Sequence, residues 1–121
     1  MSLSPAPFPF HHRLRVRWVE VDAQQVVFNG HYLTYFDIAV TEYWRSIGLP
    51  YPITTADTGG EMYTVKSTVE YHSPARYDDE VTIEARPTLL SPVRVRFDYR
   101  LTRATDGVLL AKGHTVHAAV N

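Results

Sequence analysis

The feature that most limits how this chain can fold is a single long segment with helical periodicity, residues 30–47. Its apolar residues recur at steps of three and four, which is the spacing of one helix face. They are Tyr32, Phe36, Ala39, Tyr43 and Ile47, and Leu33, Val40 and Trp44 widen the stripe. Gly48 follows, where a left-handed backbone is usual, and Pro50 cannot continue a helix. We therefore predict one long helix, buried over most of its circumference.

Five other segments alternate apolar and polar residues with a period of two, which is typical of strands with one buried face. They are residues 13–18, 63–71, 81–86, 93–101 and 108–120, and the pattern of the last is mixed. Asp106-Gly107 is a typical hairpin turn before that last segment. Together they predict an α+β fold, a five-stranded antiparallel sheet wrapped around one long central helix, with the last four strands in a meander.

The length of 121 residues fits one compact domain. The first ten residues contain three prolines, so we expect residues 1–10 to be a flexible arm and residues 11–121 to be the single domain. No apolar stretch reaches the roughly eighteen residues of a membrane-spanning helix, and no basic region precedes an apolar segment near the start. We expect a cytoplasmic protein with no membrane span.

The composition also excludes several kinds of site. The chain has no cysteine, so disulfides, thiolate nucleophiles and thiolate metal sites are excluded. His114 and His117 fall on opposite faces of a strand, and His11 and His12 do the same. We therefore expect no metal site.

The polar side of the predicted strands is rich in arginine, so we consider a nucleic-acid-binding sheet as a non-enzymatic alternative. Arginines recur there at positions 13, 15, 17, 94, 96 and 100. An RNA-binding sheet of the RRM type needs two helices and exposed aromatic residues. This chain has one predicted helix, places Phe97 and Tyr99 on the apolar side and has a formal net charge of −1. We expect no nucleic-acid partner.

Asp22 is the main candidate for chemistry. It follows the first predicted strand and lies among apolar residues, where a carboxylate is costly unless it is compensated or used. The predicted helix starts about seven residues later, and its first N–H groups, at Asn29, Gly30 and His31, have no partner within the helix. Such N–H groups are components of an oxyanion hole, although Asp22 could equally cap a turn or the helix.

Three stretches of the chain resemble hotdog-fold acyl-CoA thioesterases of the 4-hydroxybenzoyl-CoA thioesterase and YbgC-like group. The longest runs from Trp18 to Pro50, WVEVDAQQVVFNGHYLTYFDIAVTEYWRSIGLP. The second is VEYHSPARYDDEV, from Val69 to Val81, and the third is GHTVHAAVN at the C-terminus. They occur in the same order as in the family and together span most of residues 13–121.

The resemblance implies a hotdog fold that dimerises side by side, with active sites at the dimer interface. It implies hydrolysis of a small aromatic or short- to medium-chain acyl-CoA thioester, with no cofactor because coenzyme A is part of the substrate. Asp22 then acts as nucleophile or general base, and the N–H groups of Asn29 and Gly30 polarise the thioester carbonyl. The sequence leaves both roles of Asp22 open.

One departure from the family pattern concerns Gln25. Many relatives carry glycine in the loop after the aspartate, where this chain has Gln24-Gln25. If that position needs a positive φ, Gln25 must be strained or the loop must take another path. Glu42 matches an acidic residue of the family helix, and an ion pair with Arg45 explains it equally well.

Several further residues are candidates for substrate contact. Gln25 can add an amide donor, Arg76 and Lys112 can meet coenzyme A phosphates, and Tyr63 and Ser73 can line the acyl pocket from a partner subunit. The full set is Gln25, Phe28, His31, Tyr32, Tyr63, Ser73 and Arg76.

The predicted helix covers only part of a five-stranded sheet, so uncovered apolar area is expected to pair with another subunit. We expect a homodimer, with a dimer of dimers as the larger assembly. The main alternative function is a non-catalytic hotdog protein that binds acyl-CoA. A hotdog dehydratase ranks third, since it ordinarily needs a catalytic histidine for which this sequence has no clear equivalent.

Overall fold

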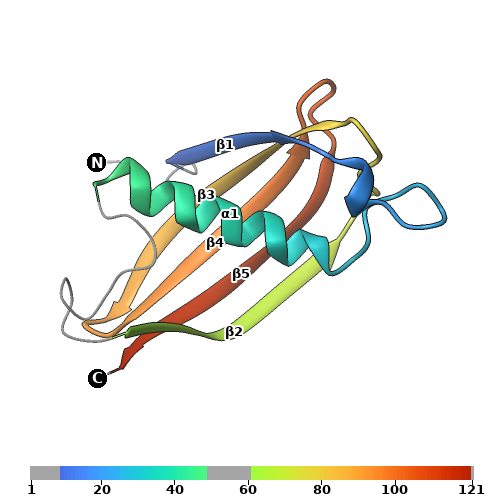
Figure 1. The fold of residues 1–121 in the computed structure, drawn as a ribbon. Helices are drawn as coiled ribbons and strands as arrows, with labels where there is room; N and C mark the ends of the chain where they lie inside the picture. The colour runs from blue at the N-terminus through green and yellow to red at the C-terminus, as the bar shows by residue number, and fades with distance from the viewer. Residues whose placement is uncertain (1–8, 49–60, 121) are drawn as a thin grey trace.

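The structure, a computed structural model, describes residues 9–48 and 61–120 and contains one antiparallel sheet wrapped around one helix (Figure 1). The helix, α1, spans His31–Ser46, and a short 3-10 helix, η1, spans Trp18–Glu20. The strands are β1 (Phe10–Arg15), β2 (Glu61–Tyr71), β3 (Glu80–Ser91), β4 (Arg94–Arg103) and β5 (Leu109–Val120). The predicted fold class is confirmed.

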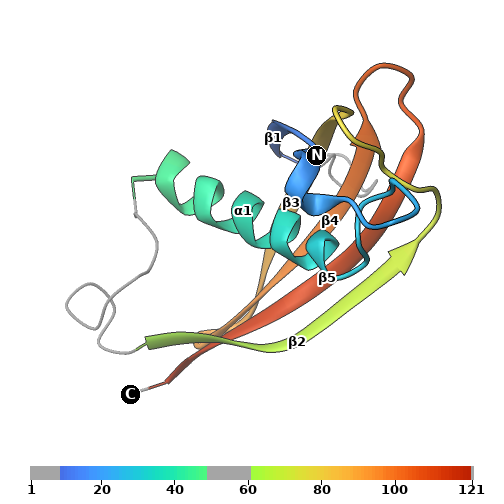
Figure 2. The same cartoon turned by 45° about the vertical axis from the view of Figure 1, so that its right-hand side comes forward.

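The strand order, β1-β3-β4-β5-β2, corrects one part of the predicted topology. β3, β4 and β5 form a meander, but β2 pairs with β5 rather than with β3, so a meander of the last four strands is wrong. The chain has a tight turn between β4 and β5, whereas residues 72–79 between β2 and β3 offer no two-residue hairpin turn. β2 and β1 therefore occupy the two edges of the sheet, on either side of α1 (Figure 2).

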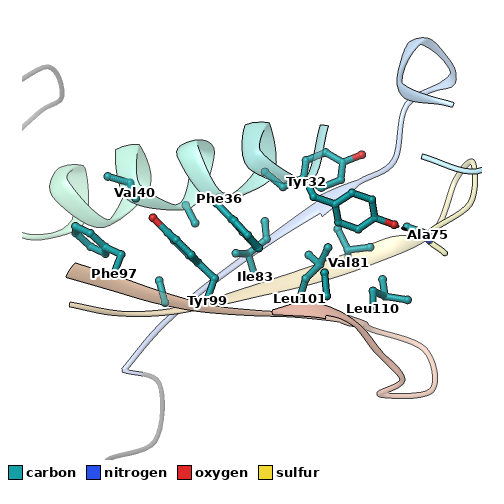
Figure 3. Packing of buried hydrophobic residues seen from close by; sticks show 14 of the residues in the cluster. Tyr32, Phe36, Val40, Ala75, Val81, Ile83, Phe97, Tyr99, Leu101 and Leu110 are labelled. Atoms are coloured by element: carbon teal, nitrogen blue, oxygen red, sulfur yellow. Dashed lines mark hydrogen bonds between the residues drawn. The ribbon is translucent and has the colours of Figure 1, made fainter. Parts of the chain in front are cut away.

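The core lies between α1 and the inner face of the central strands, as the periodicity predicts. Tyr32, Phe36 and Val40 point from α1 toward the sheet, where β3 and β4 contribute residues such as Ile83 and Tyr99 (Figure 3). The rings of Phe36 and Tyr99 stack with centroids 4.3 Å apart. This packing makes α1 a fixed element from which a site can be built.

Gly113 on β5 allows the close approach of helix and strands. A Cβ atom at this position would lie 2.1 Å from the carbonyl oxygen of Thr68 and 3.0 Å from the ring of Phe36. Both distances are shorter than ordinary van der Waals contact, so any larger residue would push β2 or α1 away.

The first strand ends earlier than predicted. β1 runs from Phe10 to Arg15, which takes in one residue of the expected arm, and residues 1–8 lie outside the described residues. Trp18, predicted on the buried face, is 64% exposed because the chain turns into η1, where the Arg17 N–H donates to the carboxylate of Glu20. Ile47 lies past the end of α1 and is also exposed, contrary to the predicted stripe.

The facing of β2 is the other correction. The alternation of residues 63–71 places Tyr63, Val65, Val69 and Tyr71 on the buried face, yet Tyr63 and Val65 are each 51% exposed. The register shifts between Thr64 and Lys66, so Val65 is an extra residue that reverses the alternation before it. After the bulge the prediction is correct, since Val69 packs against the core and the ring of Tyr71 meets that of Tyr32. β2 is also an edge strand, so only one side of it is paired within the chain.

No helix in the described part of the chain is long and apolar enough to cross a bilayer.

Candidate active site

Residues 20–28 form a miniature hairpin that leads into α1. The Asp22 N–H donates to the Val26 carbonyl at 2.9 Å, Val21 pairs with Val27, and the Phe28 N–H donates to the Glu20 carbonyl at 3.0 Å. The Val27 N–H donates to the carbonyl of Ala75 at 2.8 Å, which ties this hairpin to the loop after β2. Asp22 is thereby folded back beside the segment from which the helix starts.

The tip of this hairpin is a turn closed by Asp22 itself. The Gln25 N–H donates to the Asp22 carbonyl at 2.8 Å, and the Gln24 N–H donates to Asp22 Oδ1 at 2.8 Å. Gln25 has a φ of 64°, so of the two outcomes expected for a residue in place of glycine, the structure shows the strained one. The turn is therefore formed with a non-glycine residue at a positive φ.

The Asp22 carboxylate retains one unused oxygen. Asp22 is half-buried, and Oδ1 is occupied by the Gln24 N–H. Among the described residues, nothing donates a hydrogen bond to Oδ2. A carboxylate held by one oxygen and free at the other can attack a carbonyl or take a proton from water.

The start of α1 provides two unpaired donors. The His31 N–H donates to the Phe28 carbonyl at 2.9 Å, and the Tyr32 N–H to the Asn29 carbonyl at 3.2 Å. The N–H groups of Asn29 and Gly30, by contrast, have no acceptor among the residues that the structure describes. They lie at the positive end of the helix dipole, where a developing negative charge is stabilised.

A hollow of about 200 Å³ lies beside these donors, between the helix start and the C-terminal end of β2. It is lined by Val26, Val27, Asn29, Tyr32, Tyr71, His72, Ser73 and Pro74. Three of the predicted site residues, Asn29, Tyr32 and Ser73, therefore line the same hollow. Asp22 is not part of the lining and adjoins it through its cross-strand neighbour Val26.

The helix start and the C-terminal end of β2 lie side by side (Figure 1), and two tyrosine hydroxyls connect α1 to the end of β2 and the loop after it. The Tyr71 hydroxyl donates to the Asn29 carbonyl at 3.1 Å, and the Tyr32 hydroxyl accepts from the Ala75 N–H at 3.2 Å. Burial raises the pKa of Tyr32, so this hydroxyl stays neutral near pH 7. The sequence analysis did not include Tyr71 among the site residues, although it lies two positions before Ser73 in the second matching stretch.

Phe28, Arg76 and Tyr63, which were also predicted to contact the substrate, do not line this hollow. Phe28 is 58% exposed, and its ring meets the ring of His31 edge to face, with centroids 6.1 Å apart. Arg76 is exposed and pairs through its backbone with Val26. Tyr63 precedes Tyr71 by eight residues, about 26 Å along a strand, so it does not reach this chain's own hollow.

Glu20 is a buried carboxylate that the sequence analysis missed. It is 3% exposed, and its oxygens accept from the Arg17 N–H at 2.8 Å and the Tyr35 hydroxyl at 2.9 Å. Burial alone would raise the pKa of Glu20, but the hydrogen bonds from Arg17 and Tyr35 outweigh it and hold the pKa below its ordinary value. Tyr35 lies 15 residues away, so only the folded chain reveals this role.

Two other expectations are confirmed. The carboxylate of Glu42 forms an ion pair with Arg45, which supports its structural interpretation. His114 and His117 lie on opposite faces of β5: His114 lies beside Thr68 on the outer side, and His117 is buried against Thr115. Burial lowers the pKa of His117.

Comparison with known proteins points to one family. Residues 24–110 match the thioesterase superfamily. The acyl-CoA thioester hydrolase YbgC of Escherichia coli is 29% identical over 100 residues, which are 83% of this chain and 74% of that protein. The crystal structure of a hypothetical protein from Aquifex aeolicus has a TM-score of 0.84 at 34% identity, over 93% of this chain and 89% of that chain.

A 1,4-dihydroxy-2-naphthoyl-CoA thioesterase from Synechocystis has the same fold, with a TM-score of 0.83 at 23% identity, over 92% of this chain and 81% of that chain. The family match covers most of the chain and includes the hairpin tip, the helix start and β2. The chain therefore belongs to the thioesterase superfamily, as a hotdog-fold thioester hydrolase of the YbgC-like group.

Proposed function

We propose that this protein hydrolyses an acyl-CoA thioester at the start of α1, with Asp22 as nucleophile or general base. The observation that carries the proposal is the pair of unpaired N–H groups at Asn29 and Gly30, next to a hollow and to a carboxylate with a free oxygen. The two donors form the oxyanion hole. Each donor of this kind typically contributes about 10²- to 10³-fold to the rate.

The reaction needs few groups. Either Asp22 Oδ2 attacks the thioester carbon and forms a mixed anhydride that water then hydrolyses, or Asp22 takes a proton from the water that attacks. In both routes the carbonyl oxygen gains negative charge and accepts hydrogen bonds from Asn29 and Gly30. The carbon–sulfur bond breaks, and coenzyme A leaves as a thiolate, which is stable enough near neutral pH to need no dedicated acid.

The substrate class follows from the hollow. Tyr32 and Tyr71 contribute aromatic rings, 5.2 Å apart and edge to face, beside the helix start. Such a lining suits a small aromatic or a short- to medium-chain acyl group. YbgC of Escherichia coli, which is named an acyl-CoA thioester hydrolase, supports the coenzyme A part of this assignment.

A homodimer that joins along β2 completes the proposal. β2 is an edge strand, and its Tyr63 and Val65 are each 51% exposed in the single chain. Pairing two copies along this edge would cover these side chains and satisfy the edge's backbone groups. It would also place Tyr63 near the partner's active site, and two such dimers can associate further.

The test is thiol release from a panel of acyl-CoA thioesters graded in chain length and ring content. We expect the wild type to release thiol from at least one class, and Asp22→Asn, which keeps an acceptor for the Gln24 N–H, to lose turnover while its thermal unfolding is unchanged. If the wild type binds acyl-CoA and releases no thiol from any member, the non-catalytic acyl-CoA-binding alternative replaces the hydrolase.

A further inference from the structure

Tyr71 connects the edge strand β2 to one of the two peptide groups that supply the unpaired N–H donors. Its hydroxyl donates to the Asn29 carbonyl at 3.1 Å. That carbonyl and the Gly30 N–H belong to the same peptide group, which is planar and trans, so the two point in opposite directions. A donor that fixes the direction of the Asn29 carbonyl therefore also fixes the direction of the Gly30 N–H.

The helix start holds this peptide group less firmly than the one before it. The Phe28 carbonyl accepts the His31 N–H at 2.9 Å. The Asn29 carbonyl accepts the Tyr32 N–H at the longer distance of 3.2 Å. The N-cap is Gly30, which has no side chain to cap the helix and whose backbone rotates at little cost. The hydrogen bond from β2 therefore reaches the softer of the two peptide groups.

Tyr71 is itself held in place by the sheet. It is the last residue of β2 and pairs with Ala111 on β5, and the next N–H, that of His72, donates to the Leu110 carbonyl at 2.8 Å. The ring of Tyr71 meets that of Tyr32 edge to face, with centroids 5.2 Å apart. Backbone pairing and ring packing thus place the hydroxyl before any substrate arrives, which is what a preorganised site requires.

The hydrogen bond from Tyr71 matters more to the reaction than to the stability of the fold. Tyr71 is 49% exposed in the single chain, and a hydrogen bond that replaces one to water adds little to stability. A hydroxyl that donates to a carbonyl, however, polarises the peptide group and strengthens the hydrogen bond that its N–H donates. The benefit is largest when negative charge develops on the thioester oxygen. The hydroxyl acts on its own chain's helix and needs no free surface, so a partner strand along β2 is compatible with this role.

We propose that Tyr71 is a positioning residue for thioester hydrolysis: its hydroxyl aims and polarises the Asn29–Gly30 peptide group, and the Gly30 N–H then stabilises the oxyanion. This inference rests on the proposed acyl-CoA hydrolysis. The ring of Tyr71 belongs to the lining of the hollow, whereas its hydroxyl acts through the peptide group. Removal of the hydroxyl alone should therefore slow the chemical step and leave substrate binding unchanged.

The experiment removes the hydroxyl and keeps the ring. In Tyr71→Phe we expect kcat to fall about 5- to 50-fold, less than the roughly 10²- to 10³-fold of a lost oxyanion donor, with KM within about twofold of the wild type. Tm should fall by less than about 5 °C. The matched control is Tyr77→Phe, because Tyr77 is 51% exposed and its ring meets Trp18 edge to face at the same 5.2 Å, but it does not line the hollow. Equal kcat in the two variants overturns the inference and leaves the hydrolase standing.

A spectroscopic measurement separates failure of this inference from failure of the hydrolase. The C=O stretch of benzoyl-CoA, isotopically labelled at the thioester carbon, is recorded by difference infrared spectroscopy in Asp22→Asn and in Asp22→Asn/Tyr71→Phe. We expect binding to lower the stretching frequency in Asp22→Asn, and to lower it less in the double variant, because the Gly30 N–H is then less well aimed. That result supports the role of Tyr71 even if the wild type releases no thiol. An equal shift in both variants, or no shift in Asp22→Asn, overturns it.

Discussion

Two carboxylates two residues apart, Glu20 and Asp22, have opposite fates in this structure. Both oxygens of Glu20 are engaged: Oε1 accepts from the Arg17 N–H and the Tyr35 hydroxyl, and Oε2 from the Arg17 side chain at 3.0 Å. Asp22 is half-buried and engaged through one oxygen only. Glu20 holds the start of the hairpin against Arg17 and Tyr35, whereas Asp22 has one oxygen free to react with a substrate.

The two residues show that a carboxylate can serve either the stability of the fold or catalysis, depending on how many of its oxygens are already hydrogen-bonded. A carboxylate with all its oxygens occupied and 3% exposure cannot approach a thioester without breaking the contacts that hold η1 to α1. Asp22 can use its free oxygen while the Gln24 N–H continues to hold the other. Stability and catalysis should therefore respond separately to changes at the two positions.

The largest expected effect is the loss of activity in Asp22→Asn. The amide oxygen of asparagine can still accept the Gln24 N–H, so the turn should be kept, but the carboxylate needed for attack or proton transfer is lost. We expect kcat to fall about 10²- to 10⁴-fold, with the free energy of unfolding within about 0.5 kcal/mol of the wild type. Thiol release and denaturant unfolding measure the two quantities. Full activity in Asp22→Asn would remove Asp22 from the mechanism.

Glu20→Ala should show the reverse pattern. It leaves the buried hydroxyl of Tyr35 and the N–H of Arg17 without their acceptor, at a cost of roughly 2–4 kcal/mol of stability. The folded fraction should keep turnover within about tenfold of the wild type, since Asp22 and the helix start are unchanged. Equal unfolding midpoints of Glu20→Ala and wild type would show that these contacts contribute nothing measurable.

The two carboxylates should also differ in how they couple stability to pH. The pKa of Glu20 is lower in the folded chain than its ordinary value of 4.5, so the unfolded state binds the proton first as pH falls. The stabilisation is complete above about pH 4.5 and is lost as the pH drops toward the folded pKa. Glu20→Gln should have a flatter stability profile below pH 4.5, measured by urea unfolding at a series of pH values. Parallel profiles would contradict the assignment.

What the sequence predicts well is what depends on neighbours along the chain. The periodicity of 30–47 predicts α1, and alternation predicts the central strands, because burial there repeats with the local backbone period. Asp22 was predicted as a site residue from its apolar surroundings, its position before the helix start and the family resemblance. The first argument applies equally to Glu20, which was not considered because its burial depends on Tyr35, 15 residues away.

The features that were missed depend on contacts between distant residues. Glu20 is distinguished by Tyr35, and Tyr71 enters the site by holding Asn29, a residue 42 positions away. The bulge at Val65 reverses part of β2 and depends on pairing with β5. Because such contacts have no period, they are visible only after the fold is known.

The smallest expected effect concerns the turn that aims Asp22. Gln25 has a φ of 64°, a conformation that costs a non-glycine residue about 1–2 kcal/mol, while glycine loses about 0.5–1 kcal/mol through its freer unfolded state. Gln25→Gly should therefore be more stable by up to about 1 kcal/mol, or roughly 3–6 °C in Tm. Gln24→Gly, whose position has no positive φ, is the control and should be less stable than the wild type.

The activity of Gln25→Gly tests whether the turn only positions Asp22 or the Gln25 side chain also contacts the substrate. If the turn serves only to hold Asp22 Oδ1 through the Gln24 N–H, glycine keeps that geometry and kcat/KM should equal that of the wild type. If the Gln25 amide also donates to the substrate, kcat/KM should fall while Tm rises, and the two effects separate cleanly. A lower Tm for Gln25→Gly would mean that the side chain stabilises the turn by more than its backbone strain costs, and that the position of Asp22 depends on glutamine itself.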